Sequence, residues 1–285
     1  KPIVSTNMAD AIAAEKGIKI SKKNFPDVAF RKGVKTKFDL NKDGYLSRQE
    51  RTMVTEVTDS LIMCTKRKGG WKKYHSLKGI EYFPCLKKLE MNNINIGNPN
   101  ISKNKLLQSV RLYNTFTTYV NVNKNVRLER LYISSEVSMV GKRSLKNIDV
   151  SHNRQLEELT LIRGVSAIDV SNLSKLRMLV IGEGQLKALD VSHNPELQIL
   201  SCGGNQLTEL DVSACTKLSS FTCEKNQLKA VKLPENLTLV NFECHKNQLT
   251  ELDMKNGKVT GEMKFDTKCS VVNYAGTIHN DLMNK

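Results

Sequence analysis

Five oxygen-bearing side chains are spaced through a twelve-residue stretch in a way that suits a hard cation. At its first, third, fifth, ninth and twelfth positions stand Asp39, Asn41, Asp43, Ser47 and Glu50. Calcium prefers carboxylate, amide and carbonyl oxygens, six to eight of them around one ion. Gly44 permits the sharp turn that such a loop needs, and Tyr45 would contribute its backbone carbonyl oxygen. The spacing predicts a bound calcium ion in residues 39–50.

Helices are expected on both sides of this loop. Pro26 suits the start of a helix, and Asp27 suits its positive N-terminal end. This helix should end at Phe38, with an apolar side made of Val28, Phe30, Val34 and Phe38. A second helix is expected near 49–57, and Leu46 should hold the loop against a core. Because the loop has no paired partner, we expect a structural calcium ion rather than a signalling one.

Beyond this region the sequence repeats itself. Three copies begin at Leu197, Leu218 and Leu239, which are 21 residues apart, and share the pattern Leu-x-x-(Leu/Phe)-x-Cys-x-x-Asn-x-Leu. A fixed period of this size indicates a solenoid. The alternating apolar residues predict a short strand with one buried face, and the asparagine can hydrogen-bond backbone groups left unpaired by the following turn. One copy cannot cover its own apolar face, so the copies must stack.

The same pattern can be followed toward the N-terminus. Eight copies are expected, starting at positions 86, 107, 128, 156, 176, 197, 218 and 239. The step from 128 to 156 is 28 residues, which places an insertion in 134–147.

The repeated cysteines, Cys202, Cys223 and Cys244, should form an inward-facing ladder of thiols. Neighbouring parallel side chains point the same way, which suits a disulfide poorly. Free cysteine behaves as a small buried apolar residue, and no histidine accompanies these thiols inward to complete a metal site. We therefore assign the ladder to the core and leave the other four cysteines unassigned.

These motifs resemble those of bacterial leucine-rich repeat proteins, in the short cysteine-containing variety of internalin-like surface proteins. The loop resembles an EF-hand, and more narrowly the single loop that precedes the repeats in some secreted bacterial leucine-rich proteins. The resemblance implies an α/β, mostly β solenoid: a right-handed superhelix with parallel strands on its concave face and a short irregular convex side. Three regions follow: a helical cap domain in 1–84, repeats in 85–254, and closing strands with a tail in 255–285.

The net charge of the chain is +15, and residues 1–84 hold 18 Lys and Arg against 9 Asp and Glu. A basic run with an aromatic residue between the charges could hold an anionic ligand through Lys66, Arg67, Lys68, Trp71, Lys72 and Lys73. A solvated lysine-rich surface is the simpler interpretation, and we do not expect nucleic acid as the partner. No apolar run is long enough to span a membrane.

No catalytic motif is present: the sequence lacks Gly-x-Ser-x-Gly, a phosphate loop and His-Glu-x-x-His. We therefore expect no enzymatic activity. The outward strand positions, Thr160 among them, should be exposed and offer a surface for a partner. The residues we select there are Arg111, Tyr113, Arg130, Tyr132, Met178, Val180 and Ile199, because Tyr and Arg are enriched in binding hot spots and exposed apolar neighbours mark contact surfaces.

The main hypothesis is a secreted or cell-surface module, a monomer, that recognises a protein or glycan of a host or neighbouring cell. The family resemblance supplies that setting. The alternatives are a structural spacer that carries another surface domain, and a binder of anionic polymers through the basic N-terminal domain.

Overall fold

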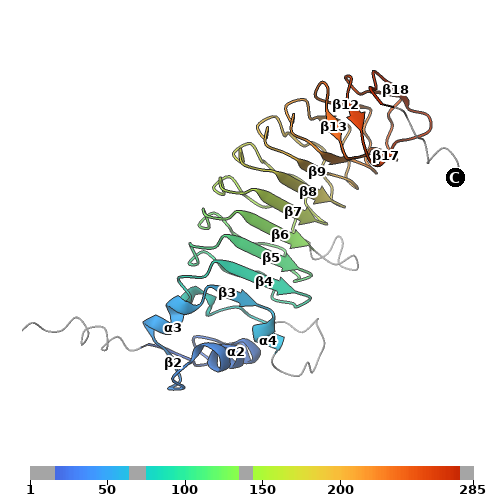
Figure 1. Cartoon of the computed structure of the whole chain (residues 1–285). Coiled ribbons are helices and arrows are strands. Elements are labelled where there is room, and N and C mark those ends of the chain that lie inside the picture. The colour runs from blue at the N-terminus through green and yellow to red at the C-terminus, as the bar shows by residue number, and fades with distance from the viewer. Residues whose placement is uncertain (1–16, 64–74, 135–143, 277–285) are drawn as a thin grey trace, which may run out of the picture.

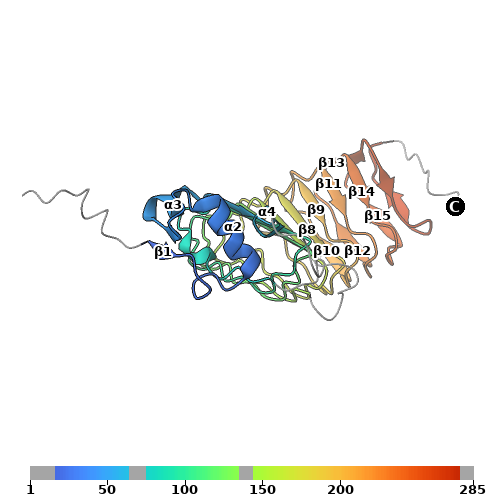
Figure 2. The ribbon, with the colours of Figure 1, turned by 90° about the horizontal axis from the view of Figure 1, so that it is seen from below.

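A computed structural model describes residues 17–63, 75–134 and 144–276 of the chain. The molecule is a curved stack of parallel rungs with a small helical region at its N-terminal end (Figure 1). Seen from below, helix α2 (Val28–Phe38) lies in front of the first rungs, at the N-terminal end of the stack (Figure 2). The structure is therefore the expected leucine-rich repeat type of solenoid, with few helices and a small helical cap.

The cap is built from short elements that alternate along the chain. They are β1 (Ile18–Lys19), α2, β2 (Tyr45–Leu46), α3 (Arg48–Met53), β3 (Glu56–Thr58), α4 (Ser60–Met63) and the 3-10 helix η1 (Ile80–Tyr82). Asp27 caps α2, since its Oδ1 accepts a hydrogen bond of 2.7 Å from the backbone N–H of Phe30. The helix expected after the loop is α3, which ends at Met53 and gives way to strand β3.

The apolar side expected for α2 is wrong at one residue. Val28 is 68% exposed, whereas Phe30 and Val34 are fully buried together with Ala29 and Gly33. These four residues are related by steps of three and four, which lie on one face of a helix. Gly33 is required there because a Cβ atom would come within 2.0 Å of the carbonyl oxygen of Leu61 in α4.

All eight predicted repeat strands are present and parallel. They are β4 (Lys88–Asn92), β5 (Ser109–Tyr113), β6 (Arg130–Ser134), β7 (Glu158–Ile162), β8 (Met178–Gly182), β9 (Ile199–Ser201), β11 (Ser220–Thr222) and β14 (Asn241–Glu243). β3 joins β4 at one end and β17 (Met263–Lys264) joins β14 at the other, which makes a sheet of ten strands. The sheet thus starts inside the cap, before the first predicted repeat.

The longer step between two of the copies leaves the register intact. Arg130 of β6 pairs with Glu158 of β7, although these residues are 28 apart in the sequence. Most of the insertion expected in 134–147 lies outside the described residues.

Toward the C-terminus, further short strands lie outside the ten-stranded sheet. They are β10 (Glu209–Asp211), β12 (Ala230–Lys232), β13 (Thr238–Leu239), β15 (Glu251–Asp253), β16 (Lys258–Val259) and β18 (Ser270–Val272). β10 pairs with β12, β13 with β16 and β15 with β18, all in parallel. The C-terminal turns therefore carry regular structure beyond the ten-stranded sheet.

The cysteine ladder is confirmed. Cys202, Cys223 and Cys244 are fully buried on successive rungs and are all free thiols. Burial raises the pKa of each of the three, with Cys202 and Cys244 adding to the effect at Cys223. These thiols therefore stay protonated and serve as core residues.

Two asparagine ladders tie several of the turns to the turn before. The predicted one, Asn205, Asn226 and Asn247, donates through Nδ2 to carbonyl oxygens of its own and the preceding turn. A second one on the opposite edge of the strands, missed in the sequence, comprises Asn104, Asn125, Asn153 and Asn194. Each of these four Nδ2 groups donates two bonds of 2.9–3.0 Å to carbonyl oxygens of the preceding turn.

Candidate functional site

The predicted calcium loop joins α2 to α3, and its ends are fixed by hydrogen bonds. Ser47 caps α3 and forms a reciprocal capping box with Glu50. Gly44 has a φ of +83°, as the sharp turn requires. Leu46 is fully buried and pairs with Ile18 of β1, so the N-terminal strand anchors the loop from outside.

Backbone N–H groups occupy most of the loop's carboxylate oxygens. Glu50 accepts from the N–H of Leu40 at 2.7 Å and from the N–H of Ser47 at 2.8 Å. Burial opposes ionisation of Glu50, but these hydrogen bonds outweigh it and hold the pKa of Glu50 below its ordinary value. Asp43 Oδ1 accepts from the N–H of Tyr45, and Asn41 Oδ1 from the N–H of Asp43.

One carboxylate group of the loop is only partly used. Asp39 is only 3% exposed; its Oδ2 accepts from the N–H of Gly44 at 3.1 Å, while its Oδ1 is buried and has no hydrogen-bond partner among the residues that the structure describes. Within residues 17–63, 75–134 and 144–276, no three His, Cys, Asp or Glu side chains are gathered as a metal-binding group. The donor types fit calcium, and Asp39 Oδ1 is a free acceptor for it, but Glu50 is engaged by the backbone.

The strand face is the outward side of the ten-stranded sheet, and the pairing register arranges its side chains in rows. The middle row consists of Thr58, Glu90, Arg111, Tyr132, Thr160, Val180, Ser201, Thr222, Glu243 and Lys264. The first row runs beside it and includes Lys88, Ser109, Arg130, Glu158, Met178, Ile199, Ser220 and Asn241.

At the N-terminal end of the strand face, Arg111 lies between two tyrosine rings. Its guanidinium carbon is 4.0 Å from the ring centroid of Tyr132, directly opposite in the register, and 5.5 Å from that of Tyr113. Its Nε donates to Asn92 Oδ1 at 3.1 Å and lies 3.9 Å from a carboxylate oxygen of Glu90. The arginine is therefore held in one orientation by stacking and by polar contacts.

Apolar side chains meet farther along the strand face. Met178 pairs with Ile199 in the register, and Val180 lies beside them in the middle row. Ile199 is 38% exposed, and Met178 and Val180 are half-buried. Thr160 departs from the expectation of an exposed position: it is only 6% exposed, between Tyr132 and Val180 in the row. The face therefore separates an aromatic and charged part from an apolar part.

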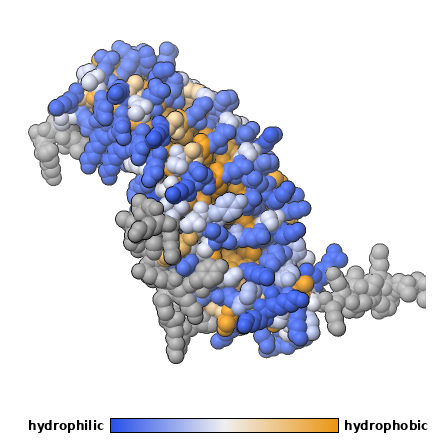
Figure 3. Space-filling model, turned by 180° about the vertical axis from the view of Figure 1, so that it is seen from behind, coloured by the Kyte–Doolittle hydropathy of each residue, from blue (hydrophilic) through white to orange (hydrophobic). Residues whose placement is uncertain are grey.

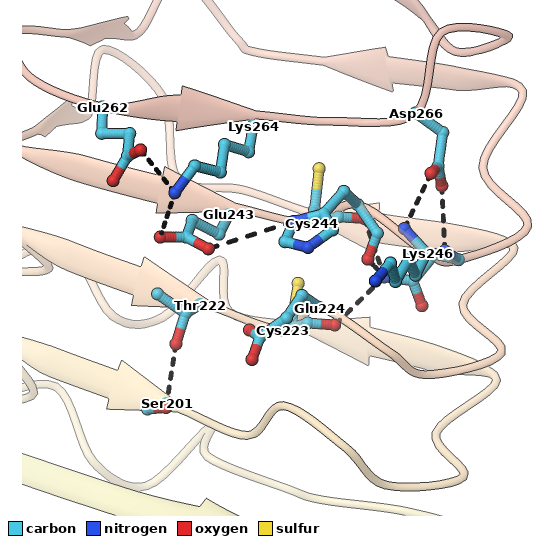
Figure 4. A network of polar contacts seen from close by, with 12 residues as sticks. Ser201, Thr222, Cys223, Glu224, Glu243, Cys244, Lys246, Glu262, Lys264 and Asp266 are labelled. Carbon is cyan, nitrogen blue, oxygen red and sulfur yellow. Dashed lines mark hydrogen bonds and ion pairs between the residues drawn. The ribbon is translucent and has the colours of Figure 1, made fainter. Parts of the chain in front are cut away.

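The C-terminal end of the strand face is polar (Figure 4). Thr222 Oγ1 donates to Ser201 Oγ at 2.8 Å, and the ammonium group of Lys264 pairs with the carboxylates of Glu243 and Glu262. The sulfur atoms of Cys223 and Cys244 lie on successive rungs of this part of the stack.

The remaining predicted partner residue is on the first row. Arg130 lies 3.8 Å from the carboxylate of Glu129 and is exposed. The basic run, Lys66, Arg67, Lys68, Trp71, Lys72 and Lys73, lies outside the described residues.

A groove that the sequence did not suggest crosses the return half of three turns. It has a volume of about 450 Å³, and its lining includes Ala188, Leu210, Ala214 and Ala230. Figure 3, the view from behind Figure 1, shows apolar surface along the middle of the stack between hydrophilic margins. The residues that line the groove come together only through the stacking of turns, so no local sequence pattern marks it.

No protein-family profile matches the chain. No curated protein matches it either. Among solved structures, it is similar to the functional domain of InlJ from Listeria monocytogenes, which includes a cysteine ladder: identity is 19%, the TM-score is 0.39, and 90% of this chain and 73% of that chain are covered.

Two further similar structures are an internalin C2 from Listeria monocytogenes and a leucine-rich repeat protein of Leptospira interrogans. For internalin C2 the identity is 18% and the TM-score 0.45, covering 72% of this chain and 96% of that chain. For the Leptospira protein the identity is 17% and the TM-score 0.47, covering 68% of this chain and 56% of that chain. The assignment of the fold rests on the strand register of this chain.

Proposed function

We propose that this chain is a non-enzymatic recognition module, secreted or displayed on a bacterial surface, which binds a protein or glycan ligand on its strand face. The observation that carries the proposal is the placement of Arg111 between the rings of Tyr113 and Tyr132. Arginine and tyrosine are the residue types that most often supply binding energy in protein interfaces.

The arrangement of these side chains favours binding in two ways. Arg111 is already oriented by the rings and by Asn92, so little side-chain freedom would be lost when a ligand docks. The pair of Met178 and Ile199 adds an apolar contact on the same face, three and four strands farther along. A ligand that spans both would meet polar and apolar contacts together, as partners do in most interfaces.

The setting of this proposal comes from the repeat pattern and its resemblance to bacterial surface proteins. Within the part of the chain that the structure describes, no helix has the length and apolar character to cross a bilayer. A glycan array and a panel of mammalian and bacterial cells would serve as probes for the fluorescently labelled chain. Saturable binding to one class of target is the expected result.

Three variants test the face itself. Arg111→Ala and Ile199→Asp should each lower binding at least tenfold, and Tyr132→Phe should retain part of it because the ring stays. Asn241→Ala, in the first row but near the C-terminal end, is the matched control and should bind as the parent chain does. Equal binding by all four variants would contradict the proposal and favour the spacer hypothesis. A loss that follows ionic strength alone would favour the anionic-polymer hypothesis.

We also propose that residues 39–50 hold a structural calcium ion. The support is the donor set Asp39, Asn41, Asp43, Ser47 and Glu50, the backbone carbonyl of Tyr45, and the buried Oδ1 of Asp39, which has no partner within the described part of the chain. Calcium would supply the positive charge that neutralises three carboxylates of the loop. The loop residues would then hold α2 and α3 together more firmly than their hydrogen bonds do alone.

Thermal melting in about 2 mM calcium tests this site. This concentration exceeds the dissociation constants of about 0.1–1 mM that are typical of calcium sites in extracellular modules. A chelator should lower the melting temperature of the cap and leave the repeats nearly unchanged. Asp39→Asn should abolish the effect of calcium, whereas Glu56→Gln, an exposed carboxylate outside the loop, should preserve it. Identical melting with calcium and with chelator in the parent chain would remove the proposal.

A further inference from the structure

A cavity lies where the cap meets the first repeat. Its volume is about 400 Å³, and it is formed by the segment around η1 and by the return half of the first turn. This volume falls within the range of about 300–1,000 Å³ that is typical of small-molecule sites. The strand face is elsewhere, because none of the residues that line the cavity belongs to a strand of the sheet.

Two asparagines with fixed side-chain oxygens line this cavity. Asn98 Oδ1 accepts from the backbone N–H groups of Thr118 and Tyr119 at 2.9 and 3.0 Å, which fixes the side chain. Asn100 Oδ1 likewise accepts from Ser102. Among the described residues neither amide nitrogen has an acceptor, so both Nδ2 groups are available to a ligand.

The charge of the lining is positive. Lys78 and Lys103 line the cavity, and neither forms an ion pair with any described carboxylate. Of the described residues in the lining, Glu81 is the one acid, and its Oε2 already accepts from the N–H of Gly79 at 2.7 Å. Two exposed lysines therefore contribute to the lining against one engaged carboxylate, which favours an anionic ligand.

The lining also has an apolar part. Leu77 and Ile96 are 3% and 2% exposed, and both contribute to the cavity surface. A ligand that suits this combination needs an acidic group, further acceptors and a compact face of C–H groups.

We infer that the cavity at the cap–repeat junction binds an acidic sugar residue. Lys78 and Lys103 hold its carboxylate or sulfate, the amides of Asn98 and Asn100 donate to its hydroxyl or ring oxygens, and its C–H face lies on Leu77 and Ile96. This inference concerns a second site and does not depend on binding at the strand face.

Calorimetric titration of the full chain tests it, with D-glucuronate, glucose 6-sulfate and neutral glucose as probes. Saturable binding of at least one acidic probe, at least tenfold tighter than that of glucose, is the expected result. Comparison of glucuronate with the sulfate ester shows whether the cavity prefers a carboxylate or a sulfate group. No binding by either acidic probe, or equal binding of glucose, overturns the inference.

Matched variants locate the binding. The double variant Lys78→Gln/Lys103→Gln should weaken binding at least tenfold, while Lys105→Gln, an exposed lysine of the same turn outside the lining, should leave it unchanged. An equal loss in both would show a general charge effect and overturn the inference. Arg111→Ala should bind the acidic probe as the parent chain does, so failure here and failure at the strand face remain separate outcomes.

Discussion

The thiol of Cys215 lies 3.8 Å from the carbonyl oxygen of Asn194 and takes over, one repeat later, the role that Asn194 plays in its own turn. Asn194 Nδ2 donates to the carbonyl oxygens of Val170 and Leu173, and Cys215 Sγ donates to those of Val191 and Asn194. Burial raises the pKa of Cys215 to about 11, so the thiol keeps the proton that it donates. A weak sulfur donor thus ends a ladder of stronger amide donors.

Removal of an amide from this ladder should be costly. Asn194→Ala removes two buried hydrogen bonds to the carbonyl oxygens of Val170 and Leu173, each of which keeps one backbone donor, and we expect it to lower the free energy of unfolding by about 2 kcal/mol. Asn172→Ala, at an exposed position of the preceding turn, should change it by less than about 0.5 kcal/mol. Urea denaturation measures both, and equal effects would show that the ladder contributes nothing. Cys215→Asn should raise stability, since it restores two amide hydrogen bonds.

The cysteine ladder should resist alkylation. Cys202, Cys223 and Cys244 are fully buried, and their raised pKa values leave little thiolate at pH 8. Under native conditions iodoacetamide should therefore spare these three and react sooner with Cys85, which is only half-buried. In denaturing urea all should react. Peptide mass spectrometry distinguishes the sites, and rapid native labelling of Cys223 would argue against a closed core.

Gly33→Ala should destabilise the cap although alanine favours helices by about 1 kcal/mol. The added Cβ would lie 2.0 Å from the carbonyl oxygen of Leu61, so α2 and α4 would have to separate. We expect a net loss of about 1–3 kcal/mol from this overpacking. Lys32→Ala, on the exposed side of the same helix, is the control and should be neutral or slightly stabilising. A stabilised Gly33→Ala variant would show that the two helices are not in close contact.

Asp253 should titrate at unusually low pH. The Lys255 ammonium, 2.8 Å away, the amide of Asn273 and the backbone N–H of Lys255 lower the pKa of Asp253 to about 2. Because the folded-state pKa is depressed, this group favours folding above its ordinary pKa of 3.8, and the contribution is lost as the pH falls through about 2. Carboxyl-carbon NMR measures the midpoint, which Lys255→Ala should raise; an unchanged midpoint would contradict the assigned cause.

The strand register was predictable in detail because each repeat carries its own pattern. Leu131 and Leu159 pair across the 28-residue step because their neighbours alternate in the same phase. Arg111 and Tyr132 were expected side by side for the same reason, since equal positions of successive copies must lie opposite each other. The stack of Cys202, Cys223 and Cys244 was predictable for the same reason, because the three thiols occupy equal positions of successive copies.

Other features could not be derived in this way. Val28 was expected inside and is exposed, because the face of α2 is chosen by the position of α4 rather than by the helix's own apolar residues. Thr160 was expected outside and is buried, since it lies between the larger side chains of Tyr132 and Val180. The asparagines at 104 and 125 were not singled out in the sequence, because their buried role depends on carbonyl groups a full turn earlier.

From the sequence alone one could determine the solenoid, its eight repeats, the inward thiols and a loop with the oxygen donors that calcium prefers. Each of these depends on spacing within a repeat or within twelve consecutive residues, where chain geometry leaves few alternatives. The tertiary structure decided how the cap joins the stack: β3 extends the sheet, β1 anchors the loop at Leu46, and a cavity forms beside Lys78 and Lys103. Such contacts join segments that share no period, so only the packed molecule determines them.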